Sequence, residues 1–208
     1  MNINIIMGNS SSTMKSNNGY LNITIGPMYA GKTSKLIEIY ENILDDELDK
    51  SNEEQKMPIV LTHSTELRYS IEKLSTHDKK QISCFKYDSI KTFINEKEDE
   101  IINNTNDILI DEAQFFTDLM EILYIVEKLK KNVYIFGLDG DFKRNKFGNV
   151  LDLIPYCDTI TKLQARCTLC GNNAIFSNRI SQSDEQILIG SQDIYQPLCR
   201  NCYNTILK

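Results

Sequence analysis

One short stretch of the sequence has residue types and spacing suited to binding phosphate, GPMYAGKT at residues 26–33. Its glycines let the backbone fold so that successive N–H groups point inward, and a following helix adds its positive end. A Lys at this position reaches the β- and γ-phosphates of a nucleotide, and the next hydroxyl binds Mg²⁺. A glycine turn with an incidental Lys is the structural alternative. The residues predicted to contact the phosphates are Gly26, Pro27, Met28, Tyr29, Ala30, Gly31, Lys32 and Thr33.

Two adjacent carboxylates end the apolar run ILIDE, at Asp111 and Glu112. A strand that ends beside the phosphate loop places the first carboxylate where it can hold Mg²⁺ through water. The second could accept a proton from the group that attacks the γ-phosphorus. That group is water in an ATPase and a substrate hydroxyl in a kinase, and these residues fit both.

Aromatic residues cluster in DEAQFF (111–116), LDGDFKRNKFG (138–148) and GSQDIYQPLCRNC (190–202). The first two stretches follow strands expected to border the nucleotide. Their four Phe residues could form an apolar slot for a flat ring, although an ordinary core role is favoured for each one alone and is less natural for Phe142 and Phe147 together. They are Phe115, Phe116, Phe142 and Phe147.

Two CxxC pairs, CTLC and CRNC, lie near the end of the sequence. Two such pairs typically form a closed tetrahedral thiolate site for structural Zn²⁺, and Gly171 suits the tight turn after the first pair. A redox or incidental role is the alternative. The predicted ligands are Cys167, Cys170, Cys199 and Cys202.

Apolar runs of strand character alternate with segments of helical spacing up to about residue 155. Helices are expected after the phosphate loop and over Leu119–Leu129. This alternation predicts an α/β fold of the P-loop NTPase type, a mostly parallel sheet with flanking helices. The strands are expected to begin at Leu21, Pro58, Gln81, Asp107 and Val133, the last in the sheet centre.

The character of the sequence changes near Tyr156. The remainder is rich in Cys, Asn and Ser, with short β-like runs at NAIFSNR and EQILIG. We therefore expect a disordered lead-in at 1–19, a nucleotide-binding domain at 20–155, and a small C-terminal zinc-ribbon domain at 156–208.

Charge and composition exclude several classes of partner for these 208 residues. The net charge of −6 argues against a nucleic-acid polymer, which a basic face normally binds. No apolar run approaches the roughly 18 residues that span a bilayer, and the first residues resemble neither a secretion signal nor a transit peptide. We expect a cytoplasmic protein.

The order of GPMYAGKT, DEAQFF, LDGDFKRNKFG and the CxxC pairs resembles the type II thymidine kinases, over about residues 20–205. The resemblance implies a P-loop α/β domain with a small zinc domain carrying a lasso loop over the base. It implies transfer of the γ-phosphate of ATP, with magnesium, to the 5′-hydroxyl of thymidine and usually deoxyuridine. Homotetramers and inhibition by dTTP are also implied.

The resemblance assigns roles to particular residues. Glu112 becomes the general base, Lys32, Thr33 and Asp111 the phosphate and magnesium group, and Arg68 a contact near the phosphates. The lasso loop corresponds to about residues 177–195. The residues implied to bind thymidine are Met28, Phe115, Leu138, Phe142, Phe147, Gln186, Leu188 and Tyr195.

Three positions depart from the family pattern. Glu66 replaces a frequent Asp, Phe176 replaces a frequent Tyr, and the polar segment 45–56 is longer than in compact relatives.

A motor or switch ATPase with a zinc-ribbon recognition module is the rival hypothesis. Such a protein would need a basic binding surface, which the negative net charge of this sequence does not supply. A zinc-ribbon scaffold with an inactive loop is the third. Since the phosphate loop and the zinc site fall in different predicted domains, we expect zinc loss to leave ATP binding intact.

Overall fold

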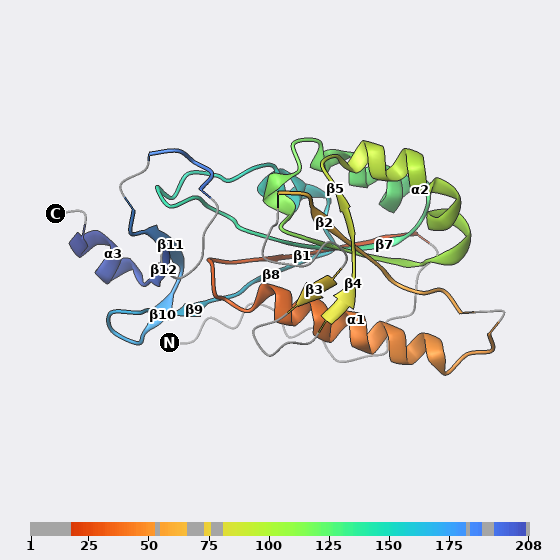
Figure 1. Ribbon diagram of the computed structural model, residues 1–208, viewed down its shortest axis with the longest axis horizontal. Helices are drawn as coiled ribbons and strands as arrows, with labels where there is room; N and C mark the ends of the chain where they lie inside the picture. The colour runs from red at the N-terminus through yellow and green to blue at the C-terminus, as the bar shows by residue number, and fades with distance from the viewer. Residues whose placement is uncertain are drawn as a thin grey trace.

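The computed structural model describes residues 18–52, 55–65, 73–75, 81–181, 184–188 and 194–206, and its centre is a six-stranded sheet (Figure 1). The strand order is β5–β2–β6–β7–β1–β8, and every neighbouring pair is parallel. This confirms the predicted α/β class and the central place of β7. The strands are β1 (Tyr20–Ile25), β2 (Ile59–His63), β5 (Phe85–Tyr87), β6 (Asp107–Asp111), β7 (Asn132–Gly137) and β8 (Thr159–Lys162).

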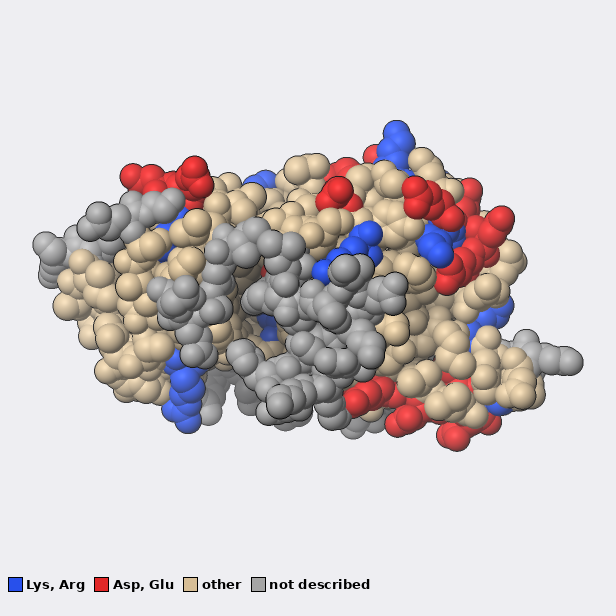
Figure 2. Space-filling model, viewed as in Figure 1, with Lys and Arg blue, Asp and Glu red and all other residues tan. Residues whose placement is uncertain are grey.

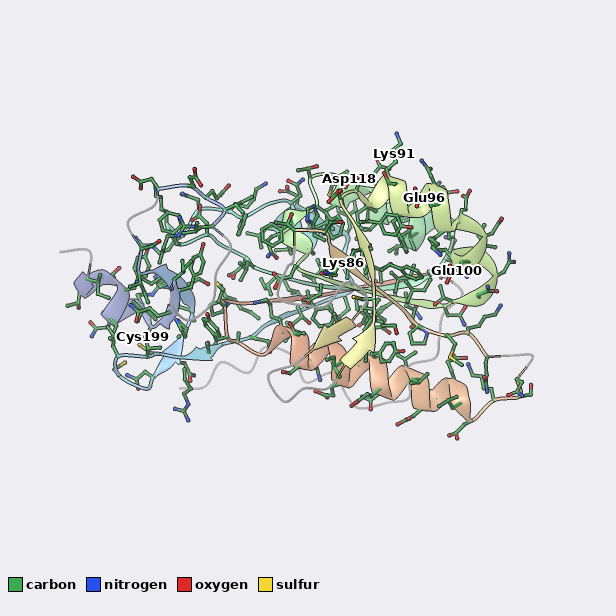
Figure 3. All side chains as sticks on the ribbon, in the orientation of Figure 1. Lys86, Lys91, Glu96, Glu100, Asp118 and Cys199 are labelled. Atoms are coloured by element: carbon green, nitrogen blue, oxygen red, sulfur yellow. The ribbon has the colours of Figure 1, made fainter. Side chains whose placement is uncertain are left out.

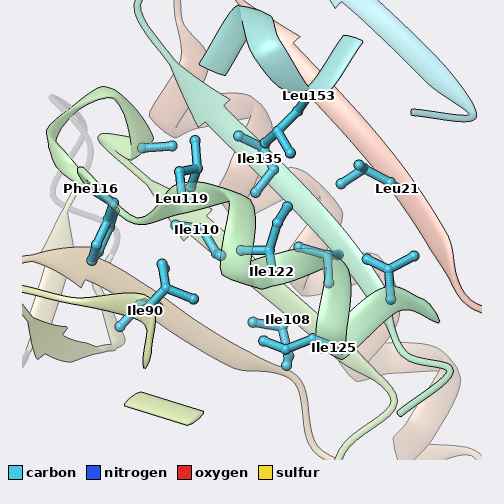
Figure 4. Close-up of a cluster of buried hydrophobic side chains, with 14 of the residues drawn as sticks. Leu21, Ile90, Ile108, Ile110, Phe116, Leu119, Ile122, Ile125, Ile135 and Leu153 are labelled. Carbon is cyan, nitrogen blue, oxygen red and sulfur yellow. The ribbon is translucent and has the colours of Figure 1, made fainter. Parts of the chain in front are cut away.

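Helices cover both faces of the sheet. Helix α1 (Lys32–Leu48) packs on one face, while α2 (Ile90–Asn104), the helical segment from Leu119 and the 3₁₀ helix η4 (Val150–Tyr156) pack on the other. Figure 4 shows side chains of the last two packed against those of the sheet. Within β6, Ile108 and Ile110 face the second group and Leu109 faces α1. This alternation follows from the two-residue period of a strand, and it explains why β6 is apolar along its length.

The helix predicted over Leu119–Leu129 exists but is not a regular α-helix. It begins as a 3₁₀ turn, η2 (Leu119–Glu121), and ends as a π turn, η3 (Tyr124–Lys128), in which Leu129 N–H donates to Tyr124 O at 3.1 Å. The wider turn brings Ile125 into the core beside Ile122.

Two strand predictions are corrected. The single strand expected from Gln81 is two strands, because β4 (Gln81–Ser83) pairs with β3 (Lys73–Ser75) in a separate hairpin, and only β5 joins the main sheet. Strand β8 was not predicted. It pairs with β1, so the sheet continues past the boundary expected at residue 155. Of the predicted lead-in, only residues 18 and 19 are described.

The C-terminal region is a small group of short elements beyond the carboxyl ends of the sheet strands (Figure 1). The run NAIFSNR forms strands, as predicted. The described part of EQILIG, residues 185–188, does not. The elements are β9 (Ala165–Arg166), β10 (Asn173–Ala174), β11 (Phe176–Arg179), β12 (Tyr195–Leu198) and α3 (Arg200–Ile206).

Acidic side chains gather over α1 and α2 on the face shown in Figure 2, where Lys and Arg are scattered. The described Lys and Arg residues drawn there form no broad basic surface. No helix in the described ranges is both long and apolar enough to cross a bilayer.

Asp118 holds the N-terminal end of α2 (Figure 3). Its carboxylate accepts hydrogen bonds from Ile90 N and Lys91 N, each at 3.0 Å, and from Ser89 Oγ at 2.7 Å. Burial raises the pKa of Asp118, but these hydrogen bonds outweigh it and hold the pKa below its usual value.

We expect Asp118→Ala to lower the free energy of unfolding by about 1–2 kcal/mol, as for the loss of a helix cap. Because the folded-state pKa lies below the unfolded one, the stabilisation is present above about pH 3.9 and is lost as pH falls through the folded value. Urea unfolding at pH 7 and in acid would measure it, with the exposed Asp99→Ala as control. Equal stability of the two variants at pH 7 would contradict the capping role.

Candidate functional site

The loop between β1 and α1 has the backbone conformations that its glycines were expected to supply. Gly31 has φ 84°, in the left-handed region, and opens α1. Gly26 has φ 155°, and a Cβ there would lie 2.7 Å from Leu163 O. A side chain at residue 26 would therefore collide with the backbone that follows β8.

Lys32 and Thr33 lie at the start of α1, against the loop and the end of β6. The Lys32 ammonium donates to Pro27 O at 2.9 Å and Gly26 O at 3.2 Å, so it is held within the loop. Thr33 Oγ1 donates to Asp111 Oδ2 at 3.1 Å. The parallel order of β1, β7 and β6 brings these groups together, since their carboxyl ends meet at one edge of the sheet.

Glu112 follows β6 in a left-handed conformation, φ 52° and ψ 38°, which disfavours a residue other than glycine. Gln114 holds its side chain. The Gln114 amide donates to Glu112 Oε2 at 2.6 Å, and its Oε1 accepts from Leu138 N at 2.9 Å. The carboxylate is thus oriented by a side chain that is itself anchored to the end of β7.

The four predicted Phe residues lie in three different environments. Phe115 and Phe147 meet edge to face, with ring centroids 5.7 Å apart, and Phe147 and Leu138 are buried. Phe116 is wholly buried in the main core, so it takes the ordinary core role. Phe142 instead stacks against Arg179 of β11, with 3.8 Å between the guanidinium carbon and the ring centroid.

One described part of the lasso loop, residues 184–188, is bound to the loop after β7. Gln186 Nε2 donates to Asp141 Oδ2 at 3.0 Å, and Lys143 pairs with Asp184 at 3.0 Å. Tyr195 Oη donates to Leu188 O at 2.9 Å. The predicted residues Gln186, Leu188 and Tyr195 therefore belong to one connected group.

The phosphate loop also contacts the C-terminal region directly. Met28 N–H donates to Ser177 Oγ of β11 at 2.9 Å. Tyr29 and Ala30 pack against the buried cluster that contains Cys167 and Cys199. The two predicted domains therefore contact each other at the loop.

The four predicted Cys ligands lie together near the start of α3 (Figure 3, Cys199). Their sulfurs lie within 4.8 Å of one another, and those of Cys170 and Cys199 are 3.6 Å apart. Tetrahedral bonds of about 2.3 Å to Zn²⁺ require sulfur separations of about 3.8 Å. Gly171, with φ 73°, forms the expected turn and donates its N–H to Cys167 O. The group could hold a metal ion.

The backbone around the cluster favours the thiolate that a metal requires. Burial raises the pKa of Cys167, but N–H groups of Cys199, Leu169 and Cys170 outweigh it and lower that pKa to about 6. Hydrogen bonds with Cys170 and Cys199 raise the pKa of Cys202 to about 12.

Three residues in this arrangement were missed by sequence reasoning. Gln114 was quoted within DEAQFF without a role, and Ser177 and Arg179 fall within the run NAIFSNR and the start of the lasso loop, where neither residue was given a role. Their alternation on β11 was the available signal, because Ser177 and Arg179 share one strand face. Arg68 and Glu66 lie outside the described residues, so their predicted places near the phosphates stay predictions.

Fold and site together define a P-loop nucleotide-binding α/β protein with a group of four Cys residues that could hold a metal ion. The family model described as thymidine kinase matches residues 19–203. The chain belongs to the thymidine kinase family.

Relatives from distant organisms share most of the chain. A thymidine kinase of Oryza sativa subsp. japonica is 35% identical over 94% of this chain and 70% of its own length. Thymidine kinase 1 of Dictyostelium discoideum is 37% identical, covering 90% and 78%. The thymidine kinase of Yaba monkey tumor virus is 36% identical, covering 91% and 97%.

Proposed function

We infer that this protein is a thymidine kinase, which transfers the γ-phosphoryl group of ATP to the 5′-hydroxyl of thymidine, and of deoxyuridine, in nucleotide salvage. Family membership supports this activity. The observation that carries the mechanism is the oriented carboxylate of Glu112 next in sequence to Asp111, which contacts Thr33 of the phosphate loop.

The roles proposed at the phosphates follow from these contacts. Lys32 and the loop N–H groups stabilise charge on the transferring phosphoryl. Thr33 and Asp111 supply oxygen ligands of the kind Mg²⁺ prefers, and Mg²⁺ bound there would neutralise phosphate charge. Glu112 accepts the 5′-hydroxyl proton as that oxygen attacks. Arg68 stays a proposed phosphate contact on the resemblance alone.

Thymidine is proposed to lie among apolar side chains and the lasso segment. The edge-to-face pair Phe115–Phe147 and the buried Leu138 support an apolar surface for a flat base. The bonds from Gln186 and Tyr195 support a segment ordered beside it. The proposed contacts are Met28, Phe115, Leu138, Phe142, Phe147, Gln186, Leu188 and Tyr195.

ATP consumption by the purified protein, with and without thymidine, tests the activity. A thymidine kinase hydrolyses little ATP alone and forms dTMP with ADP in equal amounts when thymidine is added. A switch or motor ATPase would consume ATP without thymidine, and an inactive scaffold would consume none in either case.

Assembly, regulation and location are proposed from the family resemblance. We propose a cytoplasmic homotetramer that is inhibited by the end product dTTP. Light scattering of the purified protein would test the assembly, and dTMP formation at increasing dTTP would test the inhibition.

We propose one structural Zn²⁺ per chain, held by Cys167, Cys170, Cys199 and Cys202. Cys170→Ser is expected to abolish stoichiometric zinc, measured by metal analysis. It should also raise the thymidine KM about tenfold or more, because ordering one or two extra side chains on binding costs about 1.4 kcal/mol. Since Tyr29 and Ala30 pack on this cluster, ATP affinity should fall as well.

Cys157→Ser is the matched control, since Cys157 lies outside the cluster. An unchanged thymidine KM in a zinc-free Cys170→Ser enzyme would show that the metal does not organise the thymidine site.

A further inference from the structure

Arg179, the last residue of β11, joins the lasso segment to the loop after β7. It is 7% exposed and lies opposite Tyr195 of β12 in the strand register. Its Nη2 donates to Tyr195 Oη at 2.6 Å and to Gln186 O at 3.1 Å, and its Nη1 donates to Glu185 O. The carbon of the same guanidinium lies over the Phe142 ring, 3.8 Å from the ring centroid.

This arrangement uses both properties of a guanidinium. The planar group stacks on a ring through its face while its edge donates several hydrogen bonds in one plane, which a Lys ammonium cannot do. Peptide groups are planar, and in the trans form the C=O and the next N–H point in opposite directions. By holding the carbonyls of Glu185 and Gln186, Arg179 therefore also sets the directions of the N–H groups of Gln186 and Ile187.

Arg179 also contacts the segment 184–188 indirectly, through the hydroxyl of Tyr195. Its hydroxyl accepts from Arg179 and donates to Leu188 O at 2.9 Å. One guanidinium thus contacts, directly or through one hydroxyl, four of the residues proposed to surround thymidine. They are Phe142, Gln186, Leu188 and Tyr195.

We propose that Arg179 is a positioning residue for the thymidine site, which orders residues 184–188 against Phe142 and Tyr195 before the nucleoside binds. It takes no part in phosphoryl transfer, because its contacts are with the segment and the ring. The proposal rests on the thymidine kinase function given above.

The test measures steady-state kinetics of Arg179→Met, which keeps an apolar chain over Phe142 but removes the donors. Loss of hydrogen bonds from a charged group predicts a thymidine KM raised about 10–100-fold. The kcat at saturating thymidine and the KM for ATP should change by no more than about twofold, the usual scatter for independent sites. Arg179→Lys should recover only part of the loss.

The control is Arg144→Met. Arg144 also covers an aromatic ring, Tyr203 at 4.6 Å, but it is exposed and bonds to Asn204 rather than to the segment 184–188. Its thymidine KM should match that of the unaltered protein. If neither the unaltered protein nor Arg144→Met forms dTMP, the proposed function fails rather than this inference.

Tyr195→Phe provides the second measurement. If Arg179 acts in part through that hydroxyl, the effects of Arg179→Met and Tyr195→Phe on thymidine KM will not multiply in the double variant. Independent, multiplying effects, or an Arg179→Met KM equal to that of Arg144→Met, would overturn the proposal. Should Arg179→Met fail to fold, Arg179→Lys decides, and an unchanged KM in that variant counts against the role.

Discussion

Lys32→Ala is expected to lower kcat for thymidine phosphorylation by about 10²–10³-fold or more, the usual loss when one preorganised group that stabilises transition-state charge is removed. Lys32 is 8% exposed, and its ammonium is already held 2.9 Å from Pro27 O within the phosphate loop. A group placed in advance needs little reorganisation when charge develops on the γ-phosphoryl oxygens. Initial rates of dTMP formation at saturating ATP and thymidine would measure the loss.

Lys35→Ala is the matched control, because Lys35 lies one turn further along α1 and pairs with Glu38. It should retain the unaltered rate. Thermal unfolding of both variants would show that the fold is kept, since Lys32 also bonds to the loop backbone. A Lys32→Ala enzyme with a normal kcat would exclude the loop from the proposed mechanism.

The parts of this fold that could be predicted from the sequence are those in which a short run of residues determines its own backbone conformation. The apolar run of β6 could only be a buried strand, and the glycines of 26–33 left few conformations for the loop. The CxxC pairs brought four sulfurs together because each pair needs only one turn. In each case the information lies within a few residues.

Strand β8 shows where this reasoning ends. Its sequence is TITK, and all four residues are exposed. Because none of them is buried, the strand lacks the apolar pattern by which a strand is recognised in a sequence. It becomes a strand because β1 offers an open edge, with Ile25 O accepting from Leu163 N at 2.8 Å. The residues of a strand do not by themselves predict its pairing with another strand that is distant in sequence.

The same limit applies to the site. Glu112 was identified from its neighbour Asp111 and the phosphate loop, but Gln114, which orients it, is recognisable only when the end of β7 is in place. Arg179 likewise reads as one residue of a polar strand until the segment 184–188 is folded over it. Residues that position others depend on tertiary contacts, and the sequence around them carries little of that information.

Glu112→Gln is expected to lower kcat by about 10²–10⁴-fold, the usual contribution of a positioned general base. The amide has the shape of the carboxylate and can still accept from Gln114 Nε2, which now lies 2.6 Å from Glu112 Oε2. It cannot accept the proton of the 5′-hydroxyl. The KM for thymidine should therefore change little, because the loss falls on the transition state rather than on binding.

Two further variants distinguish the general-base role of Glu112 from the roles of nearby acidic residues. Glu121→Gln removes an exposed acid of the adjacent η2 turn and should be silent. Asp111→Asn should instead raise the magnesium concentration needed for half-maximal rate, since that carboxylate contacts Thr33 and is proposed to face the metal. If Glu112→Gln kept its kcat and Asp111→Asn lost it at every magnesium concentration, the two carboxylates would have exchanged their proposed roles. The proton of the attacking hydroxyl would then leave through Asp111, the acid that ends β6.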